Sequence, residues 1–158
     1  MTAKSLLKKL MYALASVAVL IQLVPYGRQH ENPPVRQEPQ WDSATTRELI
    51  RRTCFDCHSN ETVWPWYSHV APVSWLVQRD VEAGRRHLNF SEWDRPQRHA
   101  KDAPDEVRNS AMPLPIYLPL HAEARLSKSE KQTLIDGLEA IVKRPVSESD
   151  ETEQAERE

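Results

Sequence analysis

The stretch CFDCHSNETVWPWYSHVAPVSW runs from Cys54 to Trp75 and holds both cysteines of a chain of 158 residues. Two residues separate Cys54 from Cys57, and His58 follows the second cysteine directly. Three kinds of chemistry use such a pair: a structural disulfide, a redox dithiol or half of a zinc site, and covalent attachment of haem. The rest of the sequence discriminates between them.

The first two kinds lack the features that they need. A structural disulfide stabilises most when it closes a long loop, and Cys54 and Cys57 enclose almost none. A zinc site of this type needs a second pair of ligands, but the sequence has no further cysteine and its other histidines are scattered. A dithiol oxidoreductase usually carries a βαβ pattern, which is missing here. A dithiol oxidoreductase stays open as an alternative, since exported C-x-x-C proteins exist.

Covalent haem attachment accounts for every residue of the motif. Residues i and i+3 share one face of a helical turn, so both thiols can reach the vinyl groups of one porphyrin. His58 comes next and can bind the iron as an axial ligand. C-x-x-C-H is the general signature of c-type haem attachment. The motif therefore predicts one covalently attached haem c, held by Cys54, Cys57 and His58.

Residues 1–27 have the pattern of an uncleaved signal anchor. Three lysines precede an apolar run that ends at Pro25, and no small-x-small cleavage site follows. The run is close to the length that spans a bilayer, and the preceding lysines predict a cytoplasmic N-terminus. We therefore expect a single-pass protein of the cytoplasmic (inner) membrane, with the remainder of the chain in the periplasm.

The remainder divides into a tether, a domain and a tail. Residues 28–40 include three prolines, which predict an extended, semi-rigid tether. Residues 41–144 carry the haem motif and form the expected haem-binding domain. Residues 145–158 are acidic and almost without apolar side chains, so we expect a disordered tail. The net charge of -2 offers no basic field for nucleic acid.

The domain has the pattern of an all-α fold. Three glycines against twelve prolines favour helices joined by stiff turns. We expect helices at residues 43–52, 72–87, 97–110 and 127–142. Pro104 should interrupt the third helix, whereas Ser127 and Glu130 predict a capping box at the start of the fourth. Residues 112–119, MPLPIYLP, should be irregular because prolines recur there.

Three segments together resemble one protein family. CFDCHSNETVWPWYSHVAPVSW, GRRHLNFSEW and MPLPIYLPLHAEARLS look like the bacterial haem-binding domain family of membrane-anchored monohaem c-type cytochromes. The resemblance covers roughly residues 41–142 and implies a small cytochrome c-like helical domain around one haem. The matching residues are Cys54, Cys57, His58, Ser59, Asn60, Trp64 to Ser68, Ala71, Pro72, Ser74, Trp75, Gly84, Arg85, Leu88 to Ser91, Met112, Pro113, Tyr117 and His121.

Met112 is the first candidate for the sixth position on the iron, and its rivals are His69, His87, His99 and, best of them, His121. Met112 is the one methionine of the domain, and the prolines of its loop would brace a weak thioether ligand; the alternative is that it fills a gap in the core. His121 follows the same loop and is the rival ligand, unless it holds the loop through hydrogen bonds. His69, His87 and His99 are expected to be structural or surface residues.

Three more residues are candidates for the haem pocket. Trp66 and Tyr67 are expected in its aromatic wall. Arg85 is a candidate partner for a haem propionate, because a guanidinium group pairs well with carboxylates.

The expected function is electron transfer at the periplasmic face of the membrane, with redox partner proteins that the sequence does not identify. We assign no catalytic residue and do not expect an enzyme. The alternative is a haem-based peroxidase or a gas or redox sensor, in which the sixth position is open or weakly ligated. His121 would then be the acid–base group beside the iron.

Overall fold

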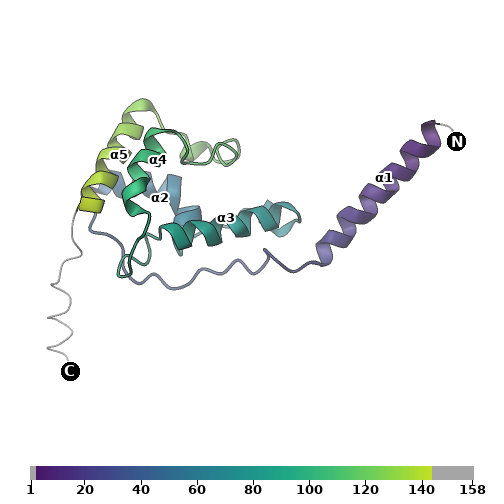
Figure 1. The fold of residues 1–158 in the computed structure, drawn as a ribbon, viewed down its shortest axis with the longest axis horizontal. Coiled ribbons are helices and arrows are strands. Elements are labelled where there is room, and N and C mark those ends of the chain that lie inside the picture. The colour runs from purple at the N-terminus through teal and green to yellow at the C-terminus, as the bar shows by residue number, and fades with distance from the viewer. Residues whose placement is uncertain (1–2, 144–158) are drawn as a thin grey trace, which may run out of the picture.

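Helices make up the regular structure of residues 3–143, which the computed structural model describes. Within this range the β pairing is limited to an isolated bridge between Gln37 and Glu92. The fold is therefore all-α, as the sequence predicts, and Figure 1 shows α2 to α5 gathered together while α1 extends away from them. The α-helices are α1 Ala3–Leu20, α2 Ala44–His58, α3 Val73–His87, α4 Ala103–Arg108 and α5 Lys128–Lys143. Short 3-10 helices are η1 Ile21–Leu23, η2 Trp66–His69, η3 Ala100–Asp102 and η4 Ala122–Ala124.

The capping box at the start of α5 is confirmed. The Ser127 hydroxyl accepts the N–H of Glu130 at 3.2 Å, and the Glu130 carboxylate accepts the N–H of Ser127 at 2.8 Å. This reciprocal pair satisfies two backbone donors that the first helical turn leaves without partners. The start of α2 is capped in a similar way, because the Ser43 hydroxyl accepts the N–H of Thr46 at 3.1 Å.

Two of the expected helices have different bounds. The helix expected over residues 43–52 continues through the cysteine motif to His58, because its buried face also continues through Thr53 and Phe55. The helix expected over 97–110 is reduced to η3 and α4. Pro104 lies in the first turn of α4 and so starts this helix rather than interrupting it, since a first-turn proline sacrifices no helical hydrogen bond.

The hydrophobic core lies where α2, α4 and α5 meet, with residues 88–90 closing it. Phe55 and Phe90 stack within it, with ring centroids 6.0 Å apart. Glycine at position 137 lets α5 approach α2 closely, because a Cβ there would lie 2.3 Å from the Thr46 methyl group. The buried core residues are Leu49, Ile50, Phe55, Leu88, Phe90, Ala100, Val107, Leu134, Ile135, Leu138 and Ile141.

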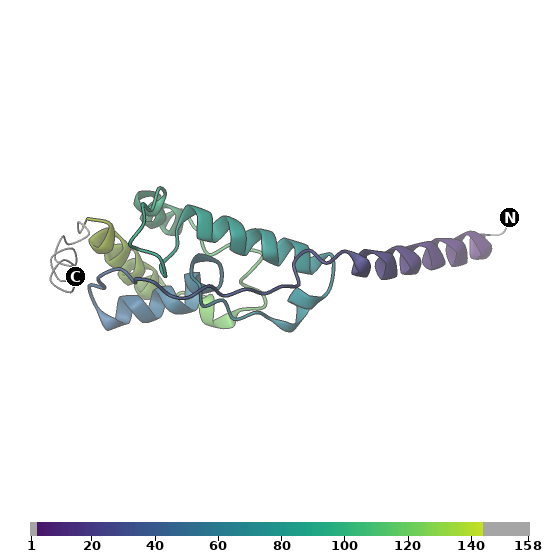
Figure 2. The ribbon, with the colours of Figure 1, turned by 90° about the horizontal axis from the view of Figure 1, so that it is seen from below.

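The predicted tether, residues 28–40, is extended, but it packs along the domain between the end of α1 and the start of α2 (Figure 2). Its prolines remove N–H donors but leave carbonyl oxygens free to accept. The Pro34 carbonyl accepts from the Asn60 side chain at 2.9 Å, and the N–H of Arg36 donates to the Ser91 carbonyl at 2.9 Å. The segment is therefore held by the domain in this structure and is not a free spacer.

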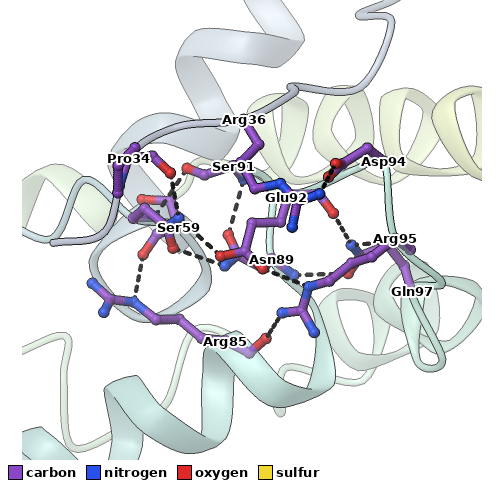
Figure 3. A network of polar contacts seen from close by, with 11 residues as sticks. Pro34, Arg36, Ser59, Arg85, Asn89, Ser91, Glu92, Asp94, Arg95 and Gln97 are labelled. Atoms are coloured by element: carbon purple, nitrogen blue, oxygen red, sulfur yellow. Dashed lines mark hydrogen bonds and ion pairs between the residues drawn. The ribbon is translucent and has the colours of Figure 1, made fainter.

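A buried polar network receives the tether on the domain side (Figure 3). Asn60 is 2% exposed, and its side chain donates to the Glu92 carboxylate at 3.0 Å and accepts from the Asn89 side chain at 2.9 Å. The Ser91 hydroxyl accepts the N–H of Asn60 at 2.9 Å. Because buried polar groups are costly without partners, these bonds specify how the tether meets the turn after α2.

One segment among residues 3–143, Ala3–Leu23, is long and apolar enough to cross a membrane. Two hydrogen bonds join the C-terminal end of this segment to the domain. The Gln22 side chain donates to the Ala71 carbonyl at 2.9 Å and accepts the Ala71 N–H at 3.0 Å. The acidic tail predicted for residues 145–158 lies outside the described residues.

Candidate functional site

A cavity of about 440 Å³ opens between α2, α3 and the irregular loop of residues 112–121. A second cavity of about 300 Å³ lies beside it, between α2, α4 and α5. The two cavities share Cys54, His58 and Met112 in their walls. Residues from two distant parts of the sequence thus meet in the walls of two neighbouring, mostly apolar cavities. Such a hollow suits a bulky cofactor with a few specific polar contacts.

The His58 ring is oriented by a backbone carbonyl. Its Nδ1 donates to the carbonyl oxygen of Leu88 at 3.0 Å, which leaves Nε2 as the nitrogen that can bind a metal. The carbonyl of His58 also accepts the N–H of Phe90 at 2.8 Å, so the residue is fixed at both ends. Burial lowers the pKa of the imidazole below its usual value. His58 is therefore held neutral and oriented, as a metal-binding histidine must be.

Both cysteines carry free thiols that line the larger cavity. Burial raises the pKa of Cys54 to about 11. Burial, together with the negative charges of Asp56 and Asp80, raises the pKa of Cys57 to about 12. Redox dithiols depend on a depressed thiol pKa, and this environment acts in the opposite direction. The arrangement therefore does not favour dithiol chemistry.

Gly84 allows α3 to form one wall of the cavity. A Cβ at this position would lie 2.3 Å from the carbonyl oxygen of Cys57 and 3.1 Å from its Cβ. Any side chain larger than hydrogen would therefore push α3 away from the end of α2. Ala83 and His87, which flank this contact on α3, also line the larger cavity.

Met112 lies on the loop that the sequence predicted to be irregular. Its N–H donates to the Glu106 carbonyl at 3.1 Å, which ties the start of the loop to α4. Met112 lines both cavities together with Cys54 and His58, although Met112 comes 54 positions after His58 in the sequence. The structure thus brings the predicted methionine to the predicted cysteines and histidine.

His121 lines the larger cavity, but both of its ring nitrogens have partners. Nδ1 lies 2.9 Å from the Tyr117 carbonyl oxygen, and Nε2 lies 3.2 Å from the Tyr67 hydroxyl. With Nδ1 donating to the carbonyl, Nε2 accepts from Tyr67. The Tyr117 ring stacks on His121 at a centroid distance of 3.6 Å. Tyr67 therefore lies in the wall of the larger cavity, and its hydrogen bond to His121 ties it to the loop of residues 112–121.

Sequence reasoning gave Tyr117 and Asp56 no role at the site. The Tyr117 hydroxyl donates to the Asp56 carboxylate at 2.6 Å, and burial with this bond raises the pKa of Tyr117. The same carboxylate accepts the N–H of Val63 at 3.0 Å. This contact joins the loop of residues 112–121 to the helical turn between the two cysteines. The position of Asp56 inside the C-x-x-C motif was the available signal.

The structure does not bring Trp66 into the cavity. Trp66 is 79% exposed and lines neither hollow, because η2 turns its ring outward, where it packs edge to face on Tyr67 at 5.9 Å. His87 lines both cavities and stacks on His99, whereas His69 contacts His30 edge to face.

Arg85 also lies outside both hollows. Its guanidinium group is occupied by the backbone and the tether: it donates to the carbonyls of Ser59 at 2.8 Å and Glu31 at 2.9 Å, and to the side chains of Asn32 and Thr62. Arg85 follows Gly84 by about 100° around α3 and so faces the tether when Gly84 faces Cys57. Among the described residues, no lysine or arginine lines either cavity.

The residues present fit haem. An oriented neutral imidazole supplies a nitrogen ligand, a thioether lies on the same hollow, and two thiols lie within one helical turn of the imidazole. His58, Met112 or both would hold the iron, and Cys54 and Cys57 would hold the porphyrin edge. The apolar walls from α3 and the loop would exclude water from the ring.

Comparison with known proteins agrees with this chemistry. A family model described as "Haem-binding domain" matches residues 16–140. Comparisons with curated proteins and with solved structures found no match. The family match covers most of the sequence, including the cysteine motif, the Met112 loop and nearly all of α5. The chain belongs to the haem-binding domain family.

Proposed function

We propose that the protein is a c-type cytochrome that transfers electrons. The observation that carries this proposal is the meeting of Cys54, Cys57, His58 and Met112 in the wall of the larger cavity. Haem bound there would supply a one-electron iron couple. The chain's own part is to attach the porphyrin through both thiols, to hold His58 by the Leu88 carbonyl, and to keep water from the ring.

Met112 is the proposed sixth ligand. The competing side chain, His121, already uses Nδ1 and Nε2 in hydrogen bonds to Tyr117 and Tyr67. Binding iron through His121 would break at least one of these bonds. A Met/His pair of ligands also raises the reduction potential, which suits a carrier.

The proposed location is the periplasmic face of the cytoplasmic membrane. Ala3–Leu23 is long and apolar enough to be an anchor, and the basic residues before it favour a cytoplasmic N-terminus. Redox partner proteins would then meet the domain outside the cytoplasm.

Visible spectra of the protein, expressed with a c-type maturation system, test the assignment. We expect a low-spin oxidised spectrum, a sharp reduced α-band, and haem that resists acid–acetone extraction. Cys57→Ala should leave the haem weakly held or absent, and replacing both Cys54 and Cys57 by alanine should make any bound haem extractable. Met112→Ala should retain haem but become high-spin and lower in potential. Leu114→Ala is the matched control, because it shortens a neighbouring apolar side chain of the same cavity wall and should remain low-spin.

An unchanged low-spin spectrum in Met112→Ala would refute the ligand assignment. A protein without haem would refute the proposal as a whole.

The second candidate function is a haem peroxidase or a gas or redox sensor. The observation that favours it is the hydrogen-bonded pair of His121 and Tyr67 at the larger cavity, which could exchange a proton with a ligand beside an open iron position. A high-spin reduced protein that binds carbon monoxide readily would favour this function over electron transfer.

A further inference from the structure

A long uncharged segment lies at one end of the domain. From Val63 to Gln78 the sequence has no aspartate, glutamate, lysine or arginine, although 28% of the whole chain is charged. The same segment contains three of the five tryptophans: Trp64, Trp66 and Trp75. Trp64 and Trp75 are partly buried, and Trp64 stacks on His30 at 4.6 Å. Trp66 remains largely outside the packed structure.

Three apolar side chains of this segment face away from the protein. Val63 is 73% exposed, Trp66 79% and Val70 46%, and none of them lines either cavity. Bound haem would therefore leave them uncovered. Single exposed apolar residues are ordinary, but these three fall within eight residues of one uncharged segment and make it a candidate contact surface. We call Val63, Trp66 and Val70 the η2 patch.

The η2 patch is held beside the end of the candidate membrane helix. The Gln22 side chain makes two hydrogen bonds to the backbone of Ala71, directly after Val70. The chain just after the candidate membrane helix also lies close to the start of α3. A Cβ on Gly27 would lie 2.4 Å from the Ser74 carbonyl oxygen. His30 contacts the Ser68 carbonyl at 3.0 Å. Figures 1 and 2 both show the start of α3 as the end of the domain that faces α1.

We propose that the η2 patch rests in the lipid headgroup region of the bilayer that α1 enters. This inference rests on the proposed membrane anchor. Tryptophan is favoured at that depth, because its ring is apolar and its N–H can still bond to polar groups. The lack of charge between Val63 and Gln78 avoids the cost of removing charged groups from water. Two attachment points, α1 and the patch, hold the haem cavity in one orientation above the membrane.

Photo-crosslinking of the full chain in phosphatidylcholine vesicles tests this contact. The photoreactive residue p-benzoylphenylalanine replaces Trp66, Leu14 or Gln132, one position at a time. Leu14 lies within α1 and reports whether the anchor is in the bilayer. Gln132 is exposed on α5, on the part of the domain opposite α1 in Figure 1, and gives the background. Lipid adducts are counted by mass spectrometry, and circular dichroism confirms that each variant is folded.

We expect lipid adducts at position 66 several-fold above those at 132 and similar to those at 14. Lipid adducts at position 14 with only background at position 66 would overturn the proposed lipid contact of the η2 patch and would support the membrane anchor. A protein adduct at 66 without lipid would also overturn it, because the surface would then receive a protein. Absence of lipid at both 14 and 66 would overturn the anchor and the patch together.

Discussion

Gly84 packs so closely on Cys57 that a Cβ on the glycine would lie 2.3 Å from the Cys57 carbonyl oxygen. This contact sets the distance between α3 and the end of α2, where both cysteines and His58 lie. The atoms in the way belong to the backbone, which cannot rotate aside as a long side chain can. A methyl group in place of the Gly84 hydrogen would therefore change the spacing between α2 and α3, which form two walls of the larger cavity.

Gly84→Ala should destabilise the fold and reduce haem incorporation. Overpacking of this kind usually costs about 1–3 kcal/mol, and here it would also displace Cys57. Urea unfolding and the ratio of haem to protein measure the two effects. Arg86→Ala, at an exposed position on the same helix, should change neither. If Gly84→Ala bound haem as the parent protein does, the close contact would not limit the site.

Arg85→Ala should release the tether rather than disturb the haem. The guanidinium group joins α3 to Ser59, Glu31 and Asn32, and hydrogen bonds from charged groups are worth about 1.5–3 kcal/mol each when buried. Because Arg85 is only partly buried, we expect a total loss of about 2 kcal/mol. Hydrogen exchange should become faster over residues 28–40, with little change in the visible spectrum.

The neighbouring Arg86→Ala variant serves as the control for charge and should leave hydrogen exchange unchanged. A loss of haem or a large shift in potential in Arg85→Ala, without faster exchange in the tether, would instead support a contact with a propionate.

Tyr117→Phe should loosen the loop that carries Met112. The variant removes the 2.6 Å bond from the Tyr117 hydroxyl to the Asp56 carboxylate, at a cost of about 1–3 kcal/mol. With the loop less constrained, we expect part of the oxidised haem to become high-spin. Tyr67→Phe is the matched control, because its 3.2 Å bond joins a histidine ring rather than a carboxylate and should matter less. Equal effects of the two variants would contradict a specific role for the Asp56 contact.

The pair of Glu38 and Arg47 should contribute a pH-dependent part of the stability. Hydrogen bonds from Arg47 at 2.7 and 2.8 Å lower the pKa of Glu38 below its usual value of 4.5, although partial burial opposes this. A carboxyl group with a lowered pKa in the folded state stabilises the protein above its ordinary pKa. This contribution is lost as the pH falls through the folded-state value.

Because Arg47 is partly exposed, the contribution should be about 1 kcal/mol or less. Urea unfolding of the parent and of Glu38→Gln should differ at neutral pH and converge well below pH 4.5. A difference that persisted in acid would mean that Glu38 acts through packing rather than charge.

Local sequence patterns predicted the all-α fold and singled out the cysteine motif, although two of the expected helices have other bounds in the structure. The spacing of Cys54, Cys57 and His58 can be interpreted from about one helical turn of sequence. The Ser127 capping box involves four consecutive residues. Met112 could be singled out as the candidate sixth ligand because the domain has no other methionine. The cysteine spacing and the capping box depend on neighbours along the chain, and the choice of Met112 depends on composition, so the sequence alone was informative for all three.

Only the tertiary structure decided which way the remaining side chains face. Trp66 and Arg85 were expected in the haem pocket, yet Trp66 points outward from η2 and Arg85 is bonded to the tether. Asp56 accepts a hydrogen bond from Tyr117, which lies on a loop 61 residues later in the sequence. These outcomes depend on where α3 and the loop lie against α2. Packing between distant segments sets that position, and no local periodicity encodes it.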